Sequence, residues 1–307
     1  MDVSIIYVNY KTSQLIIDSI DSVKEKTQEV DYEIIVVDNN SEDDSHTIIK
    51  NKHPKVLFLS LNENLGFGRA NNKGIMHAKG NYIFFLNPDT LLRNNAIKYL
   101  KDFLENNKDY GACGGNLYDE NSFPTMSFGR RFPSYFEEFA SIFYLKIPSF
   151  TSPKSYFYNY SDCILDVAFI SGADLMVKKT VIDKVGGFSR DFFMTYEETE
   201  LCYRIFKGGY KIGAVPNAKI MHLEGKSEYI NKSRLSFFYE GMLTYFHKKN
   251  PTIGIPLIYL IVQLKNNLRL LQFIILRNKK KIGYWRLKQL TCKQTFASFK
   301  NKERFTK

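Results

Sequence analysis

The chain has 307 residues, of which 44% are hydrophobic and 24% are charged, and its formal net charge is +11. These values are typical of a globular protein and exclude an intrinsically disordered or collagen-like chain. The longest apolar run covers residues 253–264, which is too short for an ordinary transmembrane helix of about 20 residues.

Two features of the sequence bear on the compartment. Residues 1–10 form a strand-like run without a basic region or a cleavage site, so we expect no signal peptide. The cysteines are scattered and form no Cys-x-x-Cys pair, so we expect neither a zinc site nor a disulfide framework, as fits a reducing compartment. They are Cys113, Cys163, Cys202 and Cys292.

Positive charge is concentrated in the C-terminal part of the chain. Residues 228–307 contain 12 Lys and 5 Arg against 3 Glu, whereas residues 1–227 carry a small net negative charge. The chain is therefore a mildly acidic body with a basic tail. This pattern does not favour a nucleic-acid-binding domain over the whole chain, but the tail could meet an anionic surface.

Strands and helices alternate in the N-terminal part. Apolar runs predict buried strands at 3–10, 32–43, 56–64 and 81–90, and helical patterns cover 12–27, 45–52, 66–80 and 95–106. Because the strands are nearly continuous apolar runs, they predict a parallel sheet with helices on both faces. Ligands bind such sheets beyond the carboxyl ends of the strands, where polar residues cluster in this sequence.

The alternation weakens after residue 110. Residues 166–179 resemble a strand with a turn at Gly172. Residues 180–193 contain a helix that is expected to end at Gly186-Gly187, and residues 195–209 form a helix that Gly208-Gly209 stops. Strand-like pieces follow in residues 210–227.

Seven short motifs occur in a fixed order along the chain: IIYVNY, EIIVVDNNSED, NLGFGRANNKG, FFLNPDT, GGF, EETELCYR and HLEGKS. This order resembles the inverting family 2 glycosyltransferases with a GT-A fold, and in particular the rhamnosyltransferase-like branch of bacterial surface-polysaccharide synthesis. The resemblance covers about residues 3–250. It implies a Rossmann-like α/β catalytic domain over 1–227, with a nucleotide-binding half at about 1–110 and an acceptor and catalytic half at about 111–227.

By this resemblance the first half binds the nucleotide of a sugar donor. Asp38 would accept a hydrogen bond from the ring N–H of uracil or thymine, unless it caps a helix. Arg69 would meet the diphosphate or the base edge through its planar guanidinium, although the glycines beside it could simply shape a turn. The other expected nucleotide contacts are Tyr7, Asn9, Tyr10 and Asn87.

Asp89 in the motif NPDT is the first expected metal ligand. A carboxylate after an apolar strand suits a divalent cation, Mn²⁺ or Mg²⁺, that bridges two phosphates. The family often has Asp-x-Asp here, and Asn87 replaces the first carboxylate; a proline turn is the structural alternative. His222 in HLEGKS is the second expected ligand by resemblance, and its nitrogen suits Mn²⁺ better than Mg²⁺. A purely structural histidine is the alternative.

The general base is expected in the motif YEETELC. The resemblance assigns it to Glu198, where the family usually has Asp, and Glu197 is the rival; glutamate can act as a base. An exposed acidic helix face is the alternative. The residues expected to flank the acceptor are Gly172, Ala173, Asp174 and Glu200. For two of them a structural role is equally open, since Glu200 could pair with Arg204 on the same helix face and Asp174 could be a turn carboxylate.

Residues 228–307 are predicted to form a helical, basic extension. Leu264, Leu268, Leu271 and Ile275 form one helical stripe beside Lys and Arg, which is typical of a helix in a membrane interface. Anionic lipid would favour the positive charge. The alternative is a helix that packs on the body and exposes a solvated basic face.

Together these features predict inverting transfer of a sugar from dTDP-rhamnose or a UDP-sugar to a hydroxyl of a lipid-linked or growing surface glycan. We expect the protein in the cytoplasm, peripheral at the inner face of the membrane. Because Asn87, Glu198 and Glu200 depart from the family pattern, a nucleotide-sugar-binding pseudoenzyme that scaffolds an assembly complex is the alternative. No nucleic-acid motif is present, so nucleic acid is not an expected partner, and a homo-oligomer is left open.

Overall fold

The computed structural model describes residues 1–143, 156–223 and 232–305. Its contacts divide the chain into two units. The first, called the sheet unit, comprises Met1–Phe132, Phe150–Arg190 and Glu197–Lys226; the second, called the helical unit, comprises Pro133–Ser149, Asp191–Tyr196 and Ser227–Lys307. The helical unit thus includes two segments from the middle of the chain, in addition to the C-terminal extension.

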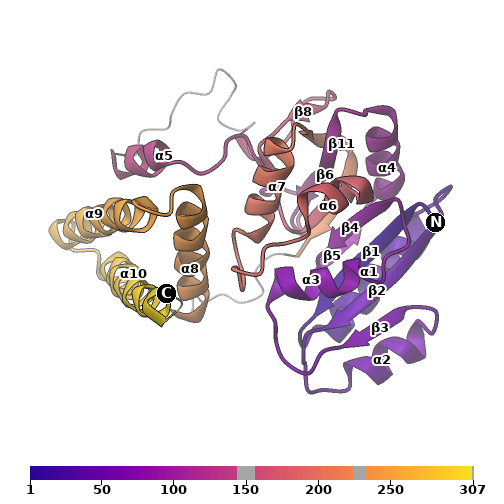
Figure 1. Cartoon of the computed structure of the whole chain (residues 1–307), viewed down its shortest axis with the longest axis horizontal. Helices are drawn as coiled ribbons and strands as arrows, with labels where there is room; N and C mark the ends of the chain where they lie inside the picture. Colours follow the sequence, from indigo (N-terminus) through magenta and orange to yellow (C-terminus); the bar gives the residue numbers. More distant parts are fainter. Residues whose placement is uncertain (144–155, 224–231, 306–307) are drawn as a thin grey trace. The chain divides into compact units, whose positions relative to one another are not determined.

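A nine-stranded mixed sheet forms the centre of the sheet unit (Figure 1). Its order is β3 (Leu57–Ser60), β2 (Tyr32–Asp38), β1 (Val3–Asn9), β4 (Tyr82–Leu86), β10 (Asp174–Lys178), β6 (Tyr110–Tyr118), β11 (Lys211–His222) and β5 (Thr90–Leu92), with β8 (Leu165–Asp166) paired to β11. Strands β3, β2, β1 and β4 are mutually parallel, as are β6 and β11. Strand β10 lies antiparallel between β4 and β6, and β5 and β8 are antiparallel to β11. A separate small sheet pairs β7 (Phe128–Gly129) with β9 (Phe169–Ile170).

Helices cover both faces of the large sheet. Successive side chains of a strand point to opposite faces, so each strand contributes to the core on both sides. Ile5 and Tyr7 of β1 belong to one core cluster, and Ile6 and Val8 belong to the other. The first cluster is shared with α1 (Ser13–Lys26), α2 (Ser45–Lys52) and α4 (Ala96–Asn106), and the second with α3 (Phe67–Ile75), α6 (Lys179–Val185) and α7 (Glu197–Lys207). The predicted α/β architecture, a mostly parallel sheet between two layers of helices, is confirmed.

Parallel pairing gathers the polar strand ends at one edge of the sheet. Asn9, the last residue of β1, is in register with Asp38, the last residue of β2. Strand β4 runs parallel to β1 on its other side and leads into the NPD motif. On the far side of β6, His222 at the end of β11 is in register with Thr90, the residue that follows Asp89.

One helix boundary agrees with the sequence expectation and one differs. Helix α6 ends at Val185, directly before the glycine pair at which its end is expected, and Gly186 has φ 84°. Helix α7 begins at Glu197 rather than at residue 195, because Thr195 and Tyr196 have φ values of 68° and 67°, outside the right-handed helical region.

The helical unit has its own aromatic-rich core. Its elements are α5 (Tyr135–Ala140), a 3₁₀ turn η1 (Ser141–Phe143), α8 (Lys232–Lys249), α9 (Gly254–Ile275) and α10 (Lys279–Phe305). Tyr239, Tyr245 and Phe246 of α8 pack with Ile258 of α9 and Cys292 of α10. The predicted helical extension is thus present. In the described part of the chain no helix combines the length and apolarity that crossing a bilayer requires.

Candidate active site

The ends of β1 and β2 carry a closed hydrogen-bond network. Asn9 is buried and donates from Nδ2 to Asp38 Oδ1 at 2.6 Å and to Ser41 Oγ at 3.1 Å. Ser41 in turn donates its hydroxyl to Asp38 Oδ1 at 2.5 Å and its backbone N–H to Oδ2 at 3.2 Å. Asn9 Oδ1 accepts bonds from the N–H and hydroxyl of Thr12. Asp38 is therefore held in a fixed position, and it does not cap α2, whose N-cap is Asp44.

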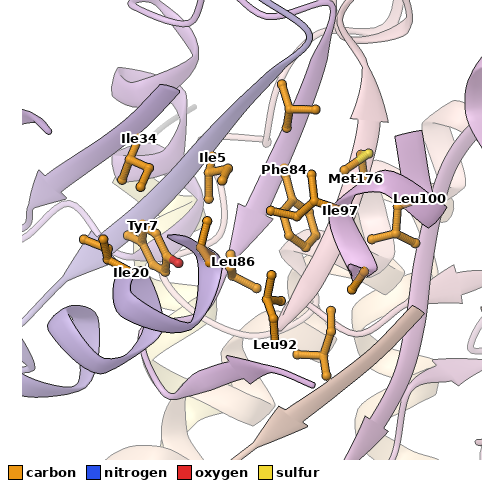
Figure 2. Close-up of a cluster of buried hydrophobic side chains, with 14 of the residues drawn as sticks. Ile5, Tyr7, Ile20, Ile34, Phe84, Leu86, Leu92, Ile97, Leu100 and Met176 are labelled. Carbon is orange, nitrogen blue, oxygen red and sulfur yellow. The ribbon is translucent and has the colours of Figure 1, made fainter. Parts of the chain in front are cut away.

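The two tyrosines predicted to contact the nucleotide lie in different surroundings. Tyr7 has no exposed surface, its ring belongs to the core drawn in Figure 2, and its hydroxyl lies 2.9 Å from Ser19 Oγ. Burial raises the pKa of Tyr7 far above its usual value. The side chain of Tyr7 is on the strand face that α1 covers, so its position does not support the predicted nucleotide contact. Tyr10 lies beyond the strand and is 47% exposed, so it remains a candidate.

The NPD motif forms a turn after β4. The N–H of Thr90 bonds to Asn87 O at 3.3 Å and its hydroxyl bonds to the same carbonyl at 2.7 Å, with Pro88 inside the turn. The proline turn considered above is therefore present, and it directs Asp89 toward β11. Asp89 Oδ1 lies 3.2 Å from His222 Nε2, and 28% of the Asp89 side chain is exposed.

The Asp89–His222 pair has donor atoms that suit a divalent cation. Burial raises the pKa of Asp89, but the hydrogen bond and charge of His222 together lower it by more, so the carboxyl is ionised at neutral pH. A carboxylate oxygen beside an imidazole nitrogen fits Mn²⁺. Among the described residues, no group of three or more His, Cys, Asp or Glu is gathered. Phosphate oxygens and water would have to supply the other ligands.

Helix α3 carries Arg69 in its first turn. Arg69 Nε is buried and bonds to no atom of the described residues, which leaves a donor for an anion. Asn72, one turn later, is engaged: its amide donates to Phe188 O and accepts the Phe188 N–H, both at 2.8 Å. Gly74 allows close packing on β1, since an added Cβ would lie 2.6 Å from Ile6 Cγ2. The sequence pattern gave Asn72 no role, and the structure shows that it ties α3 to the GGF segment.

The two candidate bases stand in the first turn of α7. Glu197 is 5% exposed, and its Oε2 bonds to no atom of the described residues. Glu198 is partly exposed and lies against Gly172, where an added Cβ would be 3.7 Å from Glu198 Cγ. Burial raises the pKa of both carboxyls, and the charge of Glu198 raises that of Glu197 further. Glu198 is thus the more accessible of the two groups.

The residues predicted to flank the acceptor are only partly available. Ala173 is buried, and its carbonyl accepts the Asn87 N–H at 3.0 Å, which places the NPD turn beside it. Asp174 has no exposed surface, and its Oδ2 accepts the Gly115 N–H at 2.6 Å. Burial raises the pKa of Asp174 well above its usual value. The side chains of Ala173 and Asp174 lie inside the fold, so Gly172 beside Glu198 is the most exposed of the three positions predicted to meet the acceptor.

Glu200 forms the ion pair with Arg204 that the helical spacing allows, which is the structural alternative to its predicted contact with the acceptor. Arg204 Nε lies 2.9 Å from Glu200 Oε1 and 3.0 Å from Oε2, and Glu200 is buried. The other nitrogens of Arg204 donate to the carbonyls of Val185, Gly186 and Gly187. This pair holds the segment after α6 against α7.

The structure therefore brings six of the predicted site residues into three groups. Asn9 and Asp38 lie at the ends of β1 and β2. Asp89, in the turn before β5, meets His222 at the end of β11, and Gly172 meets Glu198. The start of α3 also approaches α7, since an added Cβ at Gly68, beside Arg69, would lie 3.5 Å from Glu197 Cβ.

Comparison with known proteins places these residues in a family context. The family model of Glycosyl transferase family 2 matches residues 4–185. Rhamnosyltransferase WbbL of Escherichia coli K12 is 25% identical over 229 residues, which cover 68% of this chain and 82% of that protein. N-acetylglucosaminyl-diphospho-decaprenol L-rhamnosyltransferase of Mycobacterium tuberculosis is 25% identical over 209 residues, or 63% of this chain and 67% of that protein.

Solved structures show the same fold. The mannosyltransferase PcManGT from Pyrobaculum calidifontis, solved with GDP-Man and Mn²⁺, superposes with a TM-score of 0.60 at 16% identity, covering 96% of this chain and 86% of that one. GalNAc-T7, solved with UDP, GalNAc and Mn²⁺, superposes with a TM-score of 0.59 at 14% identity, covering 87% of this chain and 51% of that one. The predicted GT-A fold is thereby confirmed.

We expect Arg204→Ala to lower the free energy of unfolding by about 3 kcal/mol, because it leaves the buried Glu200 carboxylate without its partner. Chemical denaturation measures this loss. Lys179→Ala is the matched control, since it removes an i,i+4 pair with exposed Asp183 and should cost at most about 0.5 kcal/mol. Equal losses for the two variants would contradict a structural role of the Glu200–Arg204 pair.

Proposed function

Because the chain belongs to glycosyl transferase family 2, we propose that it transfers a sugar from a nucleotide-sugar donor to a hydroxyl of a lipid-linked or growing surface glycan, with inversion of configuration. The observation that carries this proposal is the position of Glu198, a partly exposed carboxyl beside Gly172 in the same unit that holds Asp38 and the Asp89–His222 pair. The named rhamnosyltransferases among the relatives favour dTDP-rhamnose as the donor, with a UDP-sugar as the second choice.

The nucleotide would bind at the ends of β1 and β2. Asn9 and Ser41 hold the Asp38 carboxylate so that it can accept the ring N–H of thymine or uracil. Exposed Tyr10 would lie against the base. Asn87 would contact the nucleotide farther along the same edge, and Arg69, with its free Nε, would meet the diphosphate.

The reaction would be a single displacement at the anomeric carbon. The acceptor hydroxyl attacks the face opposite the diphosphate, and Glu198 takes up the proton of that hydroxyl as the new C–O bond forms. The bond to the diphosphate oxygen breaks at the same time, and its electron pair leaves with the nucleoside diphosphate. Glu197 is the rival base, but its almost complete burial leaves it less access to an acceptor.

Asp89 and His222 would hold a divalent cation in this scheme. When bound, such a cation neutralises charge that develops on the leaving diphosphate. Asp89 is suited to the role because its carboxyl is ionised at neutral pH, as the lowered pKa shows.

Glu198→Gln should lower kcat by about 10²–10⁴-fold while nucleotide binding is kept, because the amide cannot accept the proton. In the unchanged protein, kcat/KM should fall as pH decreases through a value above the ordinary 4.5 of glutamate, since burial raises the pKa of Glu198. Transfer from dTDP-rhamnose to a polyprenyl-diphospho-N-acetylglucosamine, assayed between pH 4 and 9, measures both effects.

The same assay separates the alternatives for the base and for activity. A loss in Glu197→Gln but not in Glu198→Gln would reassign the base. Nucleotide binding without turnover of any donor would instead favour the pseudoenzyme that scaffolds an assembly complex.

Asp89→Ala should weaken binding of dTDP in the presence of Mn²⁺ by about tenfold or more, because it removes the only carboxylate proposed as a ligand. Calorimetric titration with dTDP and UDP, each with and without Mn²⁺, measures this. Asp109→Ala is the control, since this exposed acid precedes β6 at the opposite edge of the sheet. Metal-independent binding in the unchanged protein would contradict the cation site.

We also propose that the helical unit docks on an anionic membrane surface through the leucine face of α9. Leu260, Leu264, Leu268, Leu271 and Ile275 are all exposed. The opposite side of α9 is turned inward and is mostly apolar, with Ile255, Ile258, Ile261, Val262 and Phe273 buried. The two polar residues buried on that side have partners, since Asn266 bonds to Tyr239 and Arg269 donates to the carbonyls of Ser141 and Ile142. A helix that packs on one side and still exposes a row of leucines on the other presents a surface for an apolar partner.

The charge around this face favours lipid over a second copy of the chain. Residues 254–299 contain nine Lys or Arg and no Asp or Glu. The α9–α10 corner, residues 274–281, is exposed throughout and joins three apolar residues to Arg277 and Lys279–Lys281. Two such surfaces would repel each other, whereas anionic headgroups attract them while the leucines enter the interface.

The double change Leu268→Glu and Leu271→Glu should reduce binding to phosphatidylglycerol vesicles by at least about tenfold, because it replaces inserted apolar groups by charges that the lipid repels. Vesicle co-sedimentation measures it, with neutral phosphatidylcholine vesicles for comparison. Met76→Glu is the control: Met76 is an exposed apolar residue of the sheet unit, so this variant should bind the vesicles as the unchanged protein does. The membrane role of α9 would be overturned if the double variant bound the vesicles unchanged. It would also be overturned if the unchanged protein formed a dimer that the double variant does not form.

A further inference from the structure

We propose that helix α8 positions the general base through a strained connector, Asp191–Tyr196, which runs directly into Glu197 and Glu198. The proposal rests on the role proposed above for Glu198. It assigns Thr195 and Gly241 as positioning residues.

The connector ends in two residues with an unusual backbone. Thr195 and Tyr196 are consecutive non-glycine residues with φ values of 68° and 67°. Residues with a side chain rarely adopt this left-handed conformation, and a β-branched residue such as threonine does so least readily. Such a conformation persists only where surrounding contacts impose it. Helix α7 begins at the next residue.

Contacts with α8 fix these two residues. Thr195 Oγ1 donates to Phe237 O at 3.1 Å. Gly241, one turn further along α8, lets the helix approach the connector closely, since an added Cβ would lie 2.4 Å from Thr195 O. The ring of Tyr196 lies 5.6 Å from that of Tyr245.

The rest of the connector is anchored within the same unit. Lys248 of α8 lies 2.7 Å from the Asp191 carboxylate. Phe192 is buried in the core of the helical unit, and the ring of Phe193 lies 4.9 Å from that of Phe237. Contacts with α8 and its core are therefore distributed over the whole connector.

A fixed connector matters because a base works only at close range. The carboxylate must come within about 2.6–3.2 Å of the proton it removes. A displacement of about 1 Å can cost on the order of 10²-fold in rate. Only Glu197 separates Tyr196 from Glu198, so a change in the Thr195–Tyr196 backbone passes directly to the base.

Gly241→Ala tests the inference in the full-length protein. The new methyl group must displace the Thr195 carbonyl, so we expect kcat to fall about tenfold or more while KM for the donor changes less than about twofold. Hydrogen exchange of residues 193–200 should increase in the same variant. Gly283→Ala is the matched control, because an added Cβ at this glycine of α10 meets no atom within 4 Å, and neither quantity should change.

A second pair of variants keeps the test valid if Gly241→Ala does not fold. Thr195→Val keeps the shape and branching of the side chain but removes the hydrogen bond to Phe237, so it should lower kcat and raise exchange in residues 193–200. Thr195→Ser keeps the hydroxyl and should restore kcat to within about threefold of the unchanged protein.

The outcomes separate this inference from the proposed function. Unchanged exchange in both Gly241→Ala and Thr195→Val would show that α8 does not hold the connector. Raised exchange with unchanged kcat would show that the connector does not position the base. If the unchanged protein transfers no sugar, the proposed function fails and the role in catalysis falls with it, while the exchange result still decides whether α8 holds the connector.

Discussion

Parallel pairing of β1 with β2 and β4 is the constraint on which the candidate site depends. It brings the ends of these strands to one edge of the sheet, where no further ladder bonds satisfy the polar groups. The side-chain amide of Asn9 satisfies polar groups at this edge, because its nitrogen donates to both Asp38 and Ser41. Its oxygen accepts the N–H of Thr12, the residue that precedes α1. The end of the sheet at which we propose that the nucleotide binds is thus preorganised by groups that belong to the fold itself.

The carboxyl groups of the sheet unit differ in burial and in bonding partners, and these differences suit them to different roles. Asp174 is fully buried, and burial raises its pKa well above the usual value. Asp89 keeps an ionised carboxylate because His222 is beside it. Glu200 is bound to Arg204 and secures the GGF segment. Glu198 alone among the acids of α7's first turn combines partial exposure with a raised pKa, which is the combination that suits a general base near neutral pH.

The helical unit gives the chain a second surface and a mechanical support. Helix α9 packs through a mostly apolar side, on which buried Arg269 donates to the carbonyls that follow α5, and it exposes leucines on the other side. Helix α8 contacts the connector that leads into the first turn of α7. One compact set of helices therefore offers both an apolar face and the contacts that impose the unusual backbone of Thr195 and Tyr196.

The sequence by itself determined the fold class and most of the candidate site. Continuous apolar strands require burial on both faces, and the order of the short motifs assigned Asp38, Asp89, Glu198 and His222 before any contact was known. Only the tertiary structure decided which of the predicted side chains are exposed: Tyr7 and Glu200 belong to those motifs and Asp174 follows Gly172, but all three lie buried. A motif gives only the position of a residue along the chain. Side-chain direction, burial and partnership depend on elements distant in sequence, as with Tyr7 under α1, Asp174 beside Gly115, and Thr195 against Gly241.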